Sequence, residues 1–273
     1  MGKEMKLYQL RLKVDTEEEA NSIAESLEPD GGWAIEETED GLYLLAYFSD
    51  PPEKYKDNLT EAPDWEERFR EGFKGVAVDP FFVRPPWMDE RPGYTNIIIY
   101  PGTGFGTGEH PTTQGMLKLL AEEPEGGMVL DVGCGSGILS IAAEKLGAER
   151  IIACDIDPLA ISNCLHNLRL NKCQKVIPLL GSATCLKAKF DIILANLDFF
   201  TLVSLRDELC NLLDPRGKLL ISGFLVEDEE TIKELYRQRG LIPTRSLRIK
   251  GWSSLHLERS EVKDPRCWQK SSP

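Results

Sequence analysis

The pattern of apolar and polar positions predicts a small mixed unit at the start of the chain. Apolar and polar residues alternate, as they do in half-buried strands, over residues 5–14, 33–38 and 42–48. Thr16 and Glu19 form a capping box, which predicts a helix that runs to about Leu27. A turn at Asp40–Gly41 joins the last two strands. The first 50 residues therefore predict a compact β-α-β-β unit.

A proline-dense stretch follows this unit. Seven prolines lie between residues 51 and 92, and each of them removes a backbone donor and restricts the chain. This density favours a connector over a second folded domain. A short helix is predicted within it at Asp64–Phe73, where Trp65 and Phe69 would share one face.

From residue 96 onward, strand-like and helix-like runs alternate. Strands are predicted at 97–100, 128–131, 150–154, 176–180, 190–195, 217–222, 243–249 and 252–258, and helices at 112–122, 138–146, 158–170 and 227–239. Such alternation is typical of a doubly wound, mostly parallel sheet. Gly251 turns the last two strands into an antiparallel hairpin, which separates a methyltransferase-type sheet from a plain dinucleotide fold. We expect an α/β, Rossmann-like fold with a seven-stranded sheet whose last strand is antiparallel.

Charge is distributed unevenly over the predicted parts of the chain. These parts are an N-terminal α+β domain over residues 1–60, a Pro-rich linker over 61–92, a doubly wound domain over 93–262 and a tail over 263–273. The net charge is −13, and residues 1–65 hold 6 Lys and Arg against 17 Asp and Glu. This acidity would attract a basic partner and repel nucleic acid, although a merely solvated face explains it equally well.

Composition and cysteine usage indicate the cellular setting. With 41% hydrophobic and 28% charged residues, the chain is typical of a globular protein. It has no apolar run near the roughly 18 residues of a membrane span and no signal-peptide core, so we expect a cytoplasmic protein without a membrane partner. The seven cysteines include no C-x-x-C pair, which favours free thiols. Cys134 is either a nucleophile or, as we favour, a small residue that fills a tight turn.

A glycine loop follows the predicted strand at 128–131 and leads into an apolar helix. This arrangement lets the backbone approach a nucleotide. Ile138 stands where the dinucleotide spacing requires a glycine, so we expect a cofactor without a pyrophosphate, S-adenosylmethionine (AdoMet). A purely structural strand-to-helix turn is the alternative. The expected cofactor contacts in this loop are Asp131, Gly133, Gly135 and Gly137.

The next predicted strand, 150–154, ends in a second acidic position. Asp155 is placed to accept hydrogen bonds from both ribose hydroxyls of a nucleoside. Asp157 precedes Pro158, and this pair predicts a helix N-cap and a first helical residue. A solvated loop acid is the alternative interpretation of Asp155.

The strand at 190–195 delivers Asn196-Leu-Asp-Phe199 to the same edge of the sheet. The Asn196 carbonyl can accept a hydrogen bond from an amine and aim its lone pair, and Asp198 can attract an incoming ammonium group. The spacing resembles the Asn-Pro-Pro-aromatic motif of amine methyltransferases, so Phe199 is either a cation–π wall or a core residue. We assign these three residues to the site of the acceptor amine.

A glycine-dense loop at residues 101–113 precedes these motifs. Its composition predicts a loop that folds over a ligand. His110 is either a general base or, as we favour, a positioning residue, because no acidic group that would orient it is evident. The sequence contains no Ser-His-Asp set, metal-ligand cluster or P-loop, so we expect no metal.

Three of these motifs together resemble one family. They are Phe105-Gly-Thr-Gly-x-His-Pro-Thr-Thr113, Leu130-Asp-Val-Gly-Cys-Gly-Ser-Gly-Ile-Leu139 and Asp155-Ile-Asp-Pro158. They resemble the PrmA family of bacterial methyltransferases, which methylate large-subunit ribosomal protein eleven (L11). The likeness extends to Asp64-Trp65, Pro-Pro-Trp87 and Gly251-Trp252, and so spans nearly the whole chain.

The resemblance implies AdoMet-dependent N-methylation of lysine or N-terminal amines of L11, held as a basic substrate by the N-terminal domain. It implies that AdoMet contacts Thr113, Gly133, Asp155 and Asn196, and that the residues closing over it are Phe105 and Thr107. The sequence departs from the family's usual Asn-Ile-Leu-Ala at the acceptor edge, which leaves another protein target open. The rival functions are methylation of a nucleic-acid amine, which the acidic N-terminal part disfavours, and a non-catalytic AdoMet-binding module.

Overall fold

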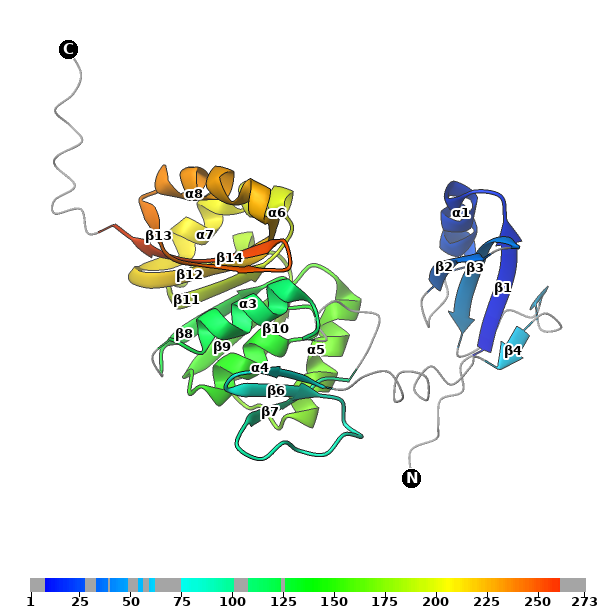
Figure 1. Cartoon of the computed structure of the whole chain (residues 1–273), viewed down its shortest axis with the longest axis horizontal. Coiled ribbons are helices and arrows are strands. Elements are labelled where there is room, and N and C mark those ends of the chain that lie inside the picture. The colour runs from blue at the N-terminus through cyan, green and yellow to red at the C-terminus, as the bar shows by residue number, and fades with distance from the viewer. Residues whose placement is uncertain are drawn as a thin grey trace, which may run out of the picture. The chain divides into compact units, whose positions relative to one another are not determined.

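The computed structural model describes residues 8–27, 33–38, 40–48, 54–55, 59–61, 75–100, 108–123 and 126–260 (Figure 1). The chain separates into two compact units, Met1–Phe73 and Lys74–Pro273. The predicted helix at Asp64–Phe73 and the predicted tail lie outside the described residues.

The described part of the first unit is an antiparallel sheet with one helix. Its elements are β1 (Tyr8–Val14), α1 (Glu17–Leu27), β2 (Trp33–Thr38), β3 (Gly41–Phe48) and β4 (Leu59–Glu61), with strand order β2-β3-β1-β4. The Glu19 amide donates to Thr16 Oγ1 at 3.1 Å, and the Asp15 amide donates to Glu19 Oε2 at 2.8 Å, which together begin the helix. The predicted β-α-β-β unit is confirmed, and β4 extends it beside β1.

Part of the predicted connector is folded into the second unit. β5 (Val76–Val78), β6 (Phe81–Arg84) and β7 (Thr95–Ile98) form a three-stranded sheet in which β6 and β7 are parallel. Buried Phe81, Val83 and Ile97 join the core beneath the next helices. The prediction of a connector was therefore wrong for residues 76–84. Pro80 lies in the turn between β5 and β6 and Pro85 follows β6, so these prolines bound the strands without interrupting a ladder.

A seven-stranded sheet forms the main body of the second unit's described residues. Its strands are β8 (Met128–Val132), β9 (Arg150–Asp155), β10 (Val176–Leu180), β11 (Phe190–Asn196), β12 (Leu213–Leu225), β13 (Leu241–Ile249) and β14 (Trp252–Arg259). The order is β10-β9-β8-β11-β12-β14-β13, and β14 runs antiparallel to both of its neighbours. The predicted mostly parallel sheet with a reversed last strand is confirmed.

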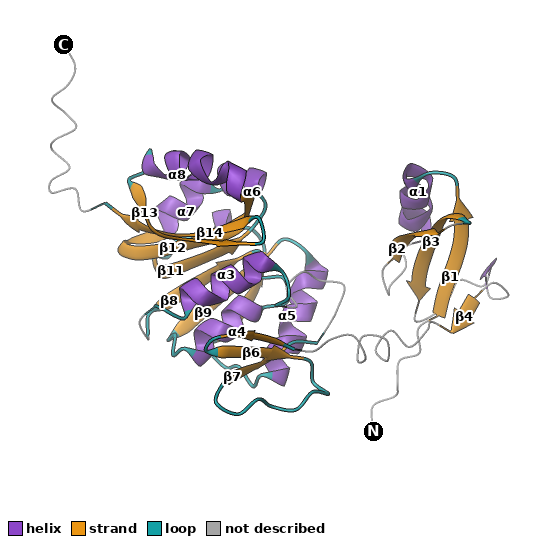
Figure 2. Cartoon of the chain, viewed as in Figure 1, coloured by secondary structure: helices purple, strands orange, loops and turns teal. Residues whose placement is uncertain are grey.

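Helices cover both faces of this sheet (Figure 2). They are α3 (Pro111–Leu120), α4 (Ile138–Lys145), α5 (Pro158–Leu170), α6 (Phe199–Ser204), α7 (Arg206–Leu212) and α8 (Glu229–Arg237), with short 3₁₀ turns η2 (Ala183–Cys185) and η3 (Val226–Asp228). Neighbouring residues of β8 point to opposite faces, so Val129 packs with the α3–α5 side and Leu130 with the α6–α8 side. Both faces are therefore buried, as a doubly wound sheet requires.

Two differences from the predicted elements concern short segments. α6 and α7 were not predicted, because six- and seven-residue helices are too short for a clear apolar period. The strand predicted at 97–100 is β7, and it belongs to the small sheet. Among the described residues, no helix is long and apolar enough to cross a membrane.

Candidate active site

The glycine loop joins the end of β8 to α4 and is fixed to the neighbouring strand. The amides of Gly133 and Cys134 donate to the Cys154 carbonyl at 2.9 and 3.1 Å. Gly133 has φ +70°, and a Cβ atom there would lie 2.3 Å from Leu197 Cδ2. Gly137, with φ +78°, is the N-cap of α4, and a Cβ atom there would lie 2.7 Å from Cys164 Sγ. The loop conformation therefore requires glycine at both positions.

Cys134 behaves as a structural residue of this loop. Its side chain is buried, and a hydrogen bond with Cys164 together with burial raises the pKa of the Cys134 thiol. A thiol that resists ionisation is a poor nucleophile. The interpretation of Cys134 as a small residue in a tight turn is the one that this environment supports.

The two acids after β9 have separate roles. Asp155 Oδ2 accepts from the Gly135 amide at 3.0 Å, and its Oδ1 accepts from the Asp157 amide at 3.0 Å. Asp157 is the N-cap of α5, where its carboxylate accepts from the Leu159 amide at 2.8 Å. The predicted cap at Asp157 is confirmed. Asp155 links the glycine loop to the start of α5 and lines the pocket described below.

Asp131 lies beneath the loop. Its carboxylate is buried and accepts from the Ser140 amide at 3.1 Å and from Ser140 Oγ at 2.6 Å. Burial raises the pKa of Asp131 to about 6, against the opposing effect of the Ser140 hydrogen bonds. Asp131 therefore fixes α4 to β8, and the structure does not place it on the pocket lining where a cofactor contact was expected.

The acceptor edge begins where β11 ends. Asn196 Oδ1 is buried and has no hydrogen-bond partner. Asp198 is the N-cap of α6 and accepts from the Thr201 amide at 3.1 Å and from Thr201 Oγ1 at 2.5 Å. Hydrogen bonds from Thr201 lower the pKa of Asp198, so its carboxylate is ionised at neutral pH. Phe199 packs against the core on the α6–α8 face and does not line the pocket, so its predicted role as a cation–π wall has no support in its position.

The start of α3 supplies the facing wall. His110 is the N-cap, and its Nδ1 lies 2.8 Å from Thr112 Oγ1. Burial lowers the pKa of His110. Its ring packs edge to face with Trp252 at 4.8 Å between centroids. Thr113 is fully buried, and its Oγ1 has no hydrogen-bond partner.

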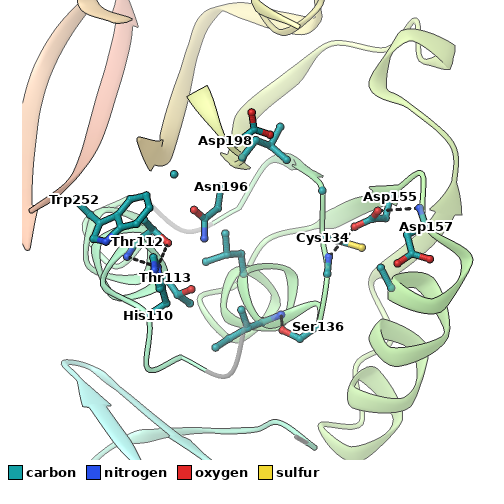
Figure 3. A pocket seen from close by; sticks show the side chains of 17 residues that line it. His110, Thr112, Thr113, Cys134, Ser136, Asp155, Asp157, Asn196, Asp198 and Trp252 are labelled. Carbon is teal, nitrogen blue, oxygen red and sulfur yellow. Dashed lines mark hydrogen bonds between the residues drawn. The ribbon is translucent and has the colours of Figure 1, made fainter. Parts of the chain in front are cut away.

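These segments enclose a pocket of about 530 Å³ at the carboxyl ends of the strands (Figure 3). Asp155 and Asp157 lie at one end of it in this view, and Trp252 and His110 lie at the other, beside Asn196. The predicted site residues that line it are Thr113, Gly133, Gly135, Asp155, Asn196 and Asp198. Those that do not are Asp131, Gly137 and Phe199, while Phe105 and Thr107 lie outside the described residues.

Several lining residues were not predicted as site residues. They are Thr112, Ser136, Ile138, Leu139, Ala160, Leu197, Gly223 and Trp252. Gly223 and Trp252 come from strands late in the sequence. The Gly251-Trp252 turn is a sequence signal for Trp252, and Gly223 has no such signal. Gly223 has φ +106° and contacts the acceptor edge so closely that a Cβ atom would lie 2.0 Å from the Leu197 carbonyl oxygen.

The lining favours a nucleoside with a cationic centre. Three carboxylates face the pocket, from Asp155, Asp157 and Asp198, and its described lining contains no Lys or Arg. Such a pocket does not suit a phosphate-rich ligand. Among the described residues, no group of three or more His, Cys, Asp or Glu could hold a metal ion.

A family model described as ribosomal protein L11 methyltransferase (PrmA) matches residues 14–260. A ribosomal protein L11 methyltransferase from Wolinella succinogenes is 35% identical over 247 residues, which cover 89% of this chain and 89% of that protein. The chain belongs to the PrmA family. A second PrmA relative, from Geotalea daltonii, is 39% identical over 221 residues and covers 74% of this chain and 70% of its own length.

Solved structures agree with membership of the PrmA family. The crystal structure of a ribosomal protein L11 methylase from Lactobacillus delbrueckii subsp. bulgaricus has a TM-score of 0.64 and 29% identity, and covers 69% of this chain and 100% of that chain. An M. jannaschii tRNA m1G37 methyltransferase, at 17% identity and a TM-score of 0.53, is similar in fold alone. As a PrmA member, the chain is a protein methyltransferase with a Rossmann-like catalytic unit.

Proposed function

We propose that the chain methylates amino groups of ribosomal protein L11, using AdoMet as the methyl donor. The PrmA relatives carry the name of this substrate. The observation that carries the proposal is the pocket at the carboxyl ends of β8, β9 and β11, in which the Asn196 Oδ1 and Thr113 Oγ1 atoms are buried without partners. Unpaired buried oxygens cost free energy that a bound ligand recovers.

The described residues fit AdoMet. The glycine loop offers close backbone approach at Gly133 and Gly135, and Asp155 has acceptor capacity beyond its two backbone bonds for a pair of ribose hydroxyls. Thr113 Oγ1 supplies a further polar contact on the facing wall. When bound, AdoMet would supply a sulfonium methyl group whose carbon a neutral amine could attack in line, with release of S-adenosylhomocysteine.

The acceptor edge would hold and orient that amine. Asn196 Oδ1 can accept a hydrogen bond from the amine nitrogen and so direct its lone pair, and ionised Asp198 can attract the ammonium form to the pocket. A lysine has an ordinary pKa near 10.4, so it must lose a proton before it reacts. Orientation of this kind can lower a barrier by about 7–11 kcal/mol, and no catalytic acid is required.

The N-terminal unit would bind the protein substrate. The 17 Asp and Glu within residues 1–65 outnumber 6 Lys and Arg, and a basic ribosomal protein is the complementary partner. We place the reaction in the cytoplasm, where a newly made ribosomal protein would meet the enzyme.

Methyl transfer to undermethylated ribosomal components tests the proposal. The full-length protein and tritiated AdoMet are added to a lysate whose ribosomes lack methylation, and proteins and RNA are then separated. We expect label in L11 and a mass increase of L11 in multiples of one methyl group. Label in another basic protein would show that L11 is not the substrate. Label in RNA would refute methylation of a protein, and the absence of label would refute the proposed methyl transfer.

A further inference from the structure

Trp252 lies at the acceptor end of the pocket, although it is far from Asn196 in the sequence. It begins β14 directly after the turn at Gly251 and pairs with Leu225 of β12. On the other side of β12, Ser222 pairs with Asn196. The sheet therefore brings the indole and the Asn196 amide to one edge, and both line the same pocket (Figure 3).

The indole is held in place by His110. The two rings pack edge to face, with centroids 4.8 Å apart and an interplanar angle of 68°. Burial lowers the pKa of His110, so its ring is neutral at pH 7 and does not act as a cation toward the indole. Because no Lys or Arg belongs to the described pocket lining, the site offers Trp252 no protein cation.

The surroundings of Trp252 are suited to a cationic ligand. Asp155, Asp157 and Asp198 give the pocket a negative potential that attracts cations. An aromatic face adds a second attraction for a cation. Phe199, the aromatic residue that the acceptor motif suggested for this role, packs in the core. Among the described lining residues, Trp252 supplies the Phe, Tyr or Trp ring.

We propose that Trp252 forms the aromatic wall of the lysine site and binds the lysine ammonium group, before deprotonation and after methylation, by a cation–π interaction. The proposal rests on the proposed function and specifies its acceptor. Each added methyl group removes an N–H donor from the lysine nitrogen, so carboxylates bind the methylated forms less well. An aromatic face retains its attraction for a quaternary ammonium group. Trp252 therefore allows the same lysine to be bound through successive methylations.

Peptide binding to the full-length protein tests this role without turnover. One short peptide carries a single trimethyllysine, and a second is identical except that carbon replaces the quaternary nitrogen and removes the charge. Both are titrated calorimetrically into wild type, Trp252→Phe, Trp252→Leu and the control Phe200→Leu, with S-adenosylhomocysteine saturating. Phe200 is the matched control because it is 81% exposed and does not line the pocket.

We expect wild type to bind the cationic peptide about 3- to 30-fold more tightly than the neutral one. Trp252→Phe and Phe200→Leu should keep most of this preference, while Trp252→Leu should lose most of it. Unchanged S-adenosylhomocysteine affinity and unfolding temperature would show that each variant is folded. The proposed role of Trp252 is ruled out if wild type shows no preference for the cationic peptide or if Trp252→Leu keeps that preference. It is also ruled out if Trp252→Phe and Trp252→Leu reduce the preference equally. These titrations need no methyl transfer. Failure of L11 methylation in the lysate experiment can therefore be told apart from failure of the proposed role of Trp252.

Discussion

Two buried oxygens in the pocket, Asn196 Oδ1 and Thr113 Oγ1, have no hydrogen-bond partner in the protein. An unsatisfied buried acceptor costs about 1–3 kcal/mol, which a folded protein tolerates where a ligand supplies the missing donor. The two atoms come from different segments, β11 and α3, and converge on one pocket. At the scale of single residues, these two buried oxygens without hydrogen-bond partners mark the site.

Replacement of Asn196 tests its orienting role. We expect Asn196→Ala to lower kcat about 100-fold at saturating AdoMet, because misplacing a reacting group by about 1 Å has an effect of that size. Exposed Asn211→Ala, outside the pocket lining, should leave kcat unchanged. Methyl transfer to purified L11 measures both variants. Wild-type turnover in Asn196→Ala would show that the amide does not orient the amine.

The buried carboxyl of Asp131 leads to a prediction of how the protein's stability depends on pH. Its folded-state pKa is about 6, above the ordinary value near 3.9, so the native state retains a proton that the unfolded state has already lost. Stability from this group is therefore lost as pH rises through this window. Asp131→Asn cannot ionise, so its stability relative to wild type should increase by about 1 kcal/mol between pH 5 and pH 7.5. Urea unfolding at both pH values measures the difference, and a gap that stays constant would refute the burial effect.

At the scale of elements, local signals in the sequence were sufficient where a few neighbouring residues decide the structure. The Asp157-Pro158 pair predicted the start of α5, because an N-cap and a first helical residue act within one turn. The glycine loop likewise predicted a nucleotide-type turn after β8. By contrast, β5 and β6 were missed because their partners, not their own proline-rich sequence, stabilise them.

The presence of Trp252 and Gly223 in the pocket could not be predicted from local pattern. Their positions follow from the order β11-β12-β14, which is fixed by pairing between segments distant in the sequence. Phe199 is the opposite case. Its spacing from Asn196 predicted a place in the site, but in α6 it packs against the core. Side chains at the ends of β8, β9 and β11 were therefore predictable, while the pocket positions of Gly223 in β12 and Trp252 in β14 were not.

Glu229 connects the elements that position Trp252. This buried carboxylate at the start of α8 accepts from Arg248 Nε at 2.8 Å and Ser253 Oγ at 2.8 Å, and Lys233 Nζ lies 2.5 Å away. Hydrogen bonds from Arg248 hold the pKa of Glu229 well below its usual range, against the opposing effect of burial. Its stabilising effect is present above the ordinary Glu pKa and is lost as pH falls below that value.

We expect Glu229→Gln to lower the free energy of unfolding by about 2–4 kcal/mol at pH 7, because the amide group of Gln turns a donor toward Arg248 and Lys233. The loss should shrink below about pH 4, because the carboxyl of the unfolded wild type then takes up a proton that the native carboxylate resists. Glu230→Gln is the control, since the exposed Glu230 side chain also contacts Lys233 but its replacement should lower the free energy of unfolding far less. Equal losses in the two variants would mean that the buried network adds nothing.

At the scale of the whole molecule, the pocket and the acidic segment belong to different units. Every residue that lines the described pocket lies between residues 110 and 252, within the second unit. The acidic residues that would attract a basic protein lie mainly in the first. If the first unit binds the protein substrate as proposed, cofactor binding and substrate recognition can be removed independently.

Deletion of the first unit tests that separation. A chain of residues 74–273 should bind AdoMet with the affinity of the full protein, because the pocket lining is retained, and should methylate a short lysine peptide at a similar rate. Its kcat/KM for intact L11 should fall at least about 100-fold, equivalent to roughly 3 kcal/mol of lost binding. Calorimetry with AdoMet and methyl transfer to the two substrates give these values. Full activity of the shortened chain on L11 would assign substrate recognition to the catalytic unit and leave the acidic segment as a solvated surface.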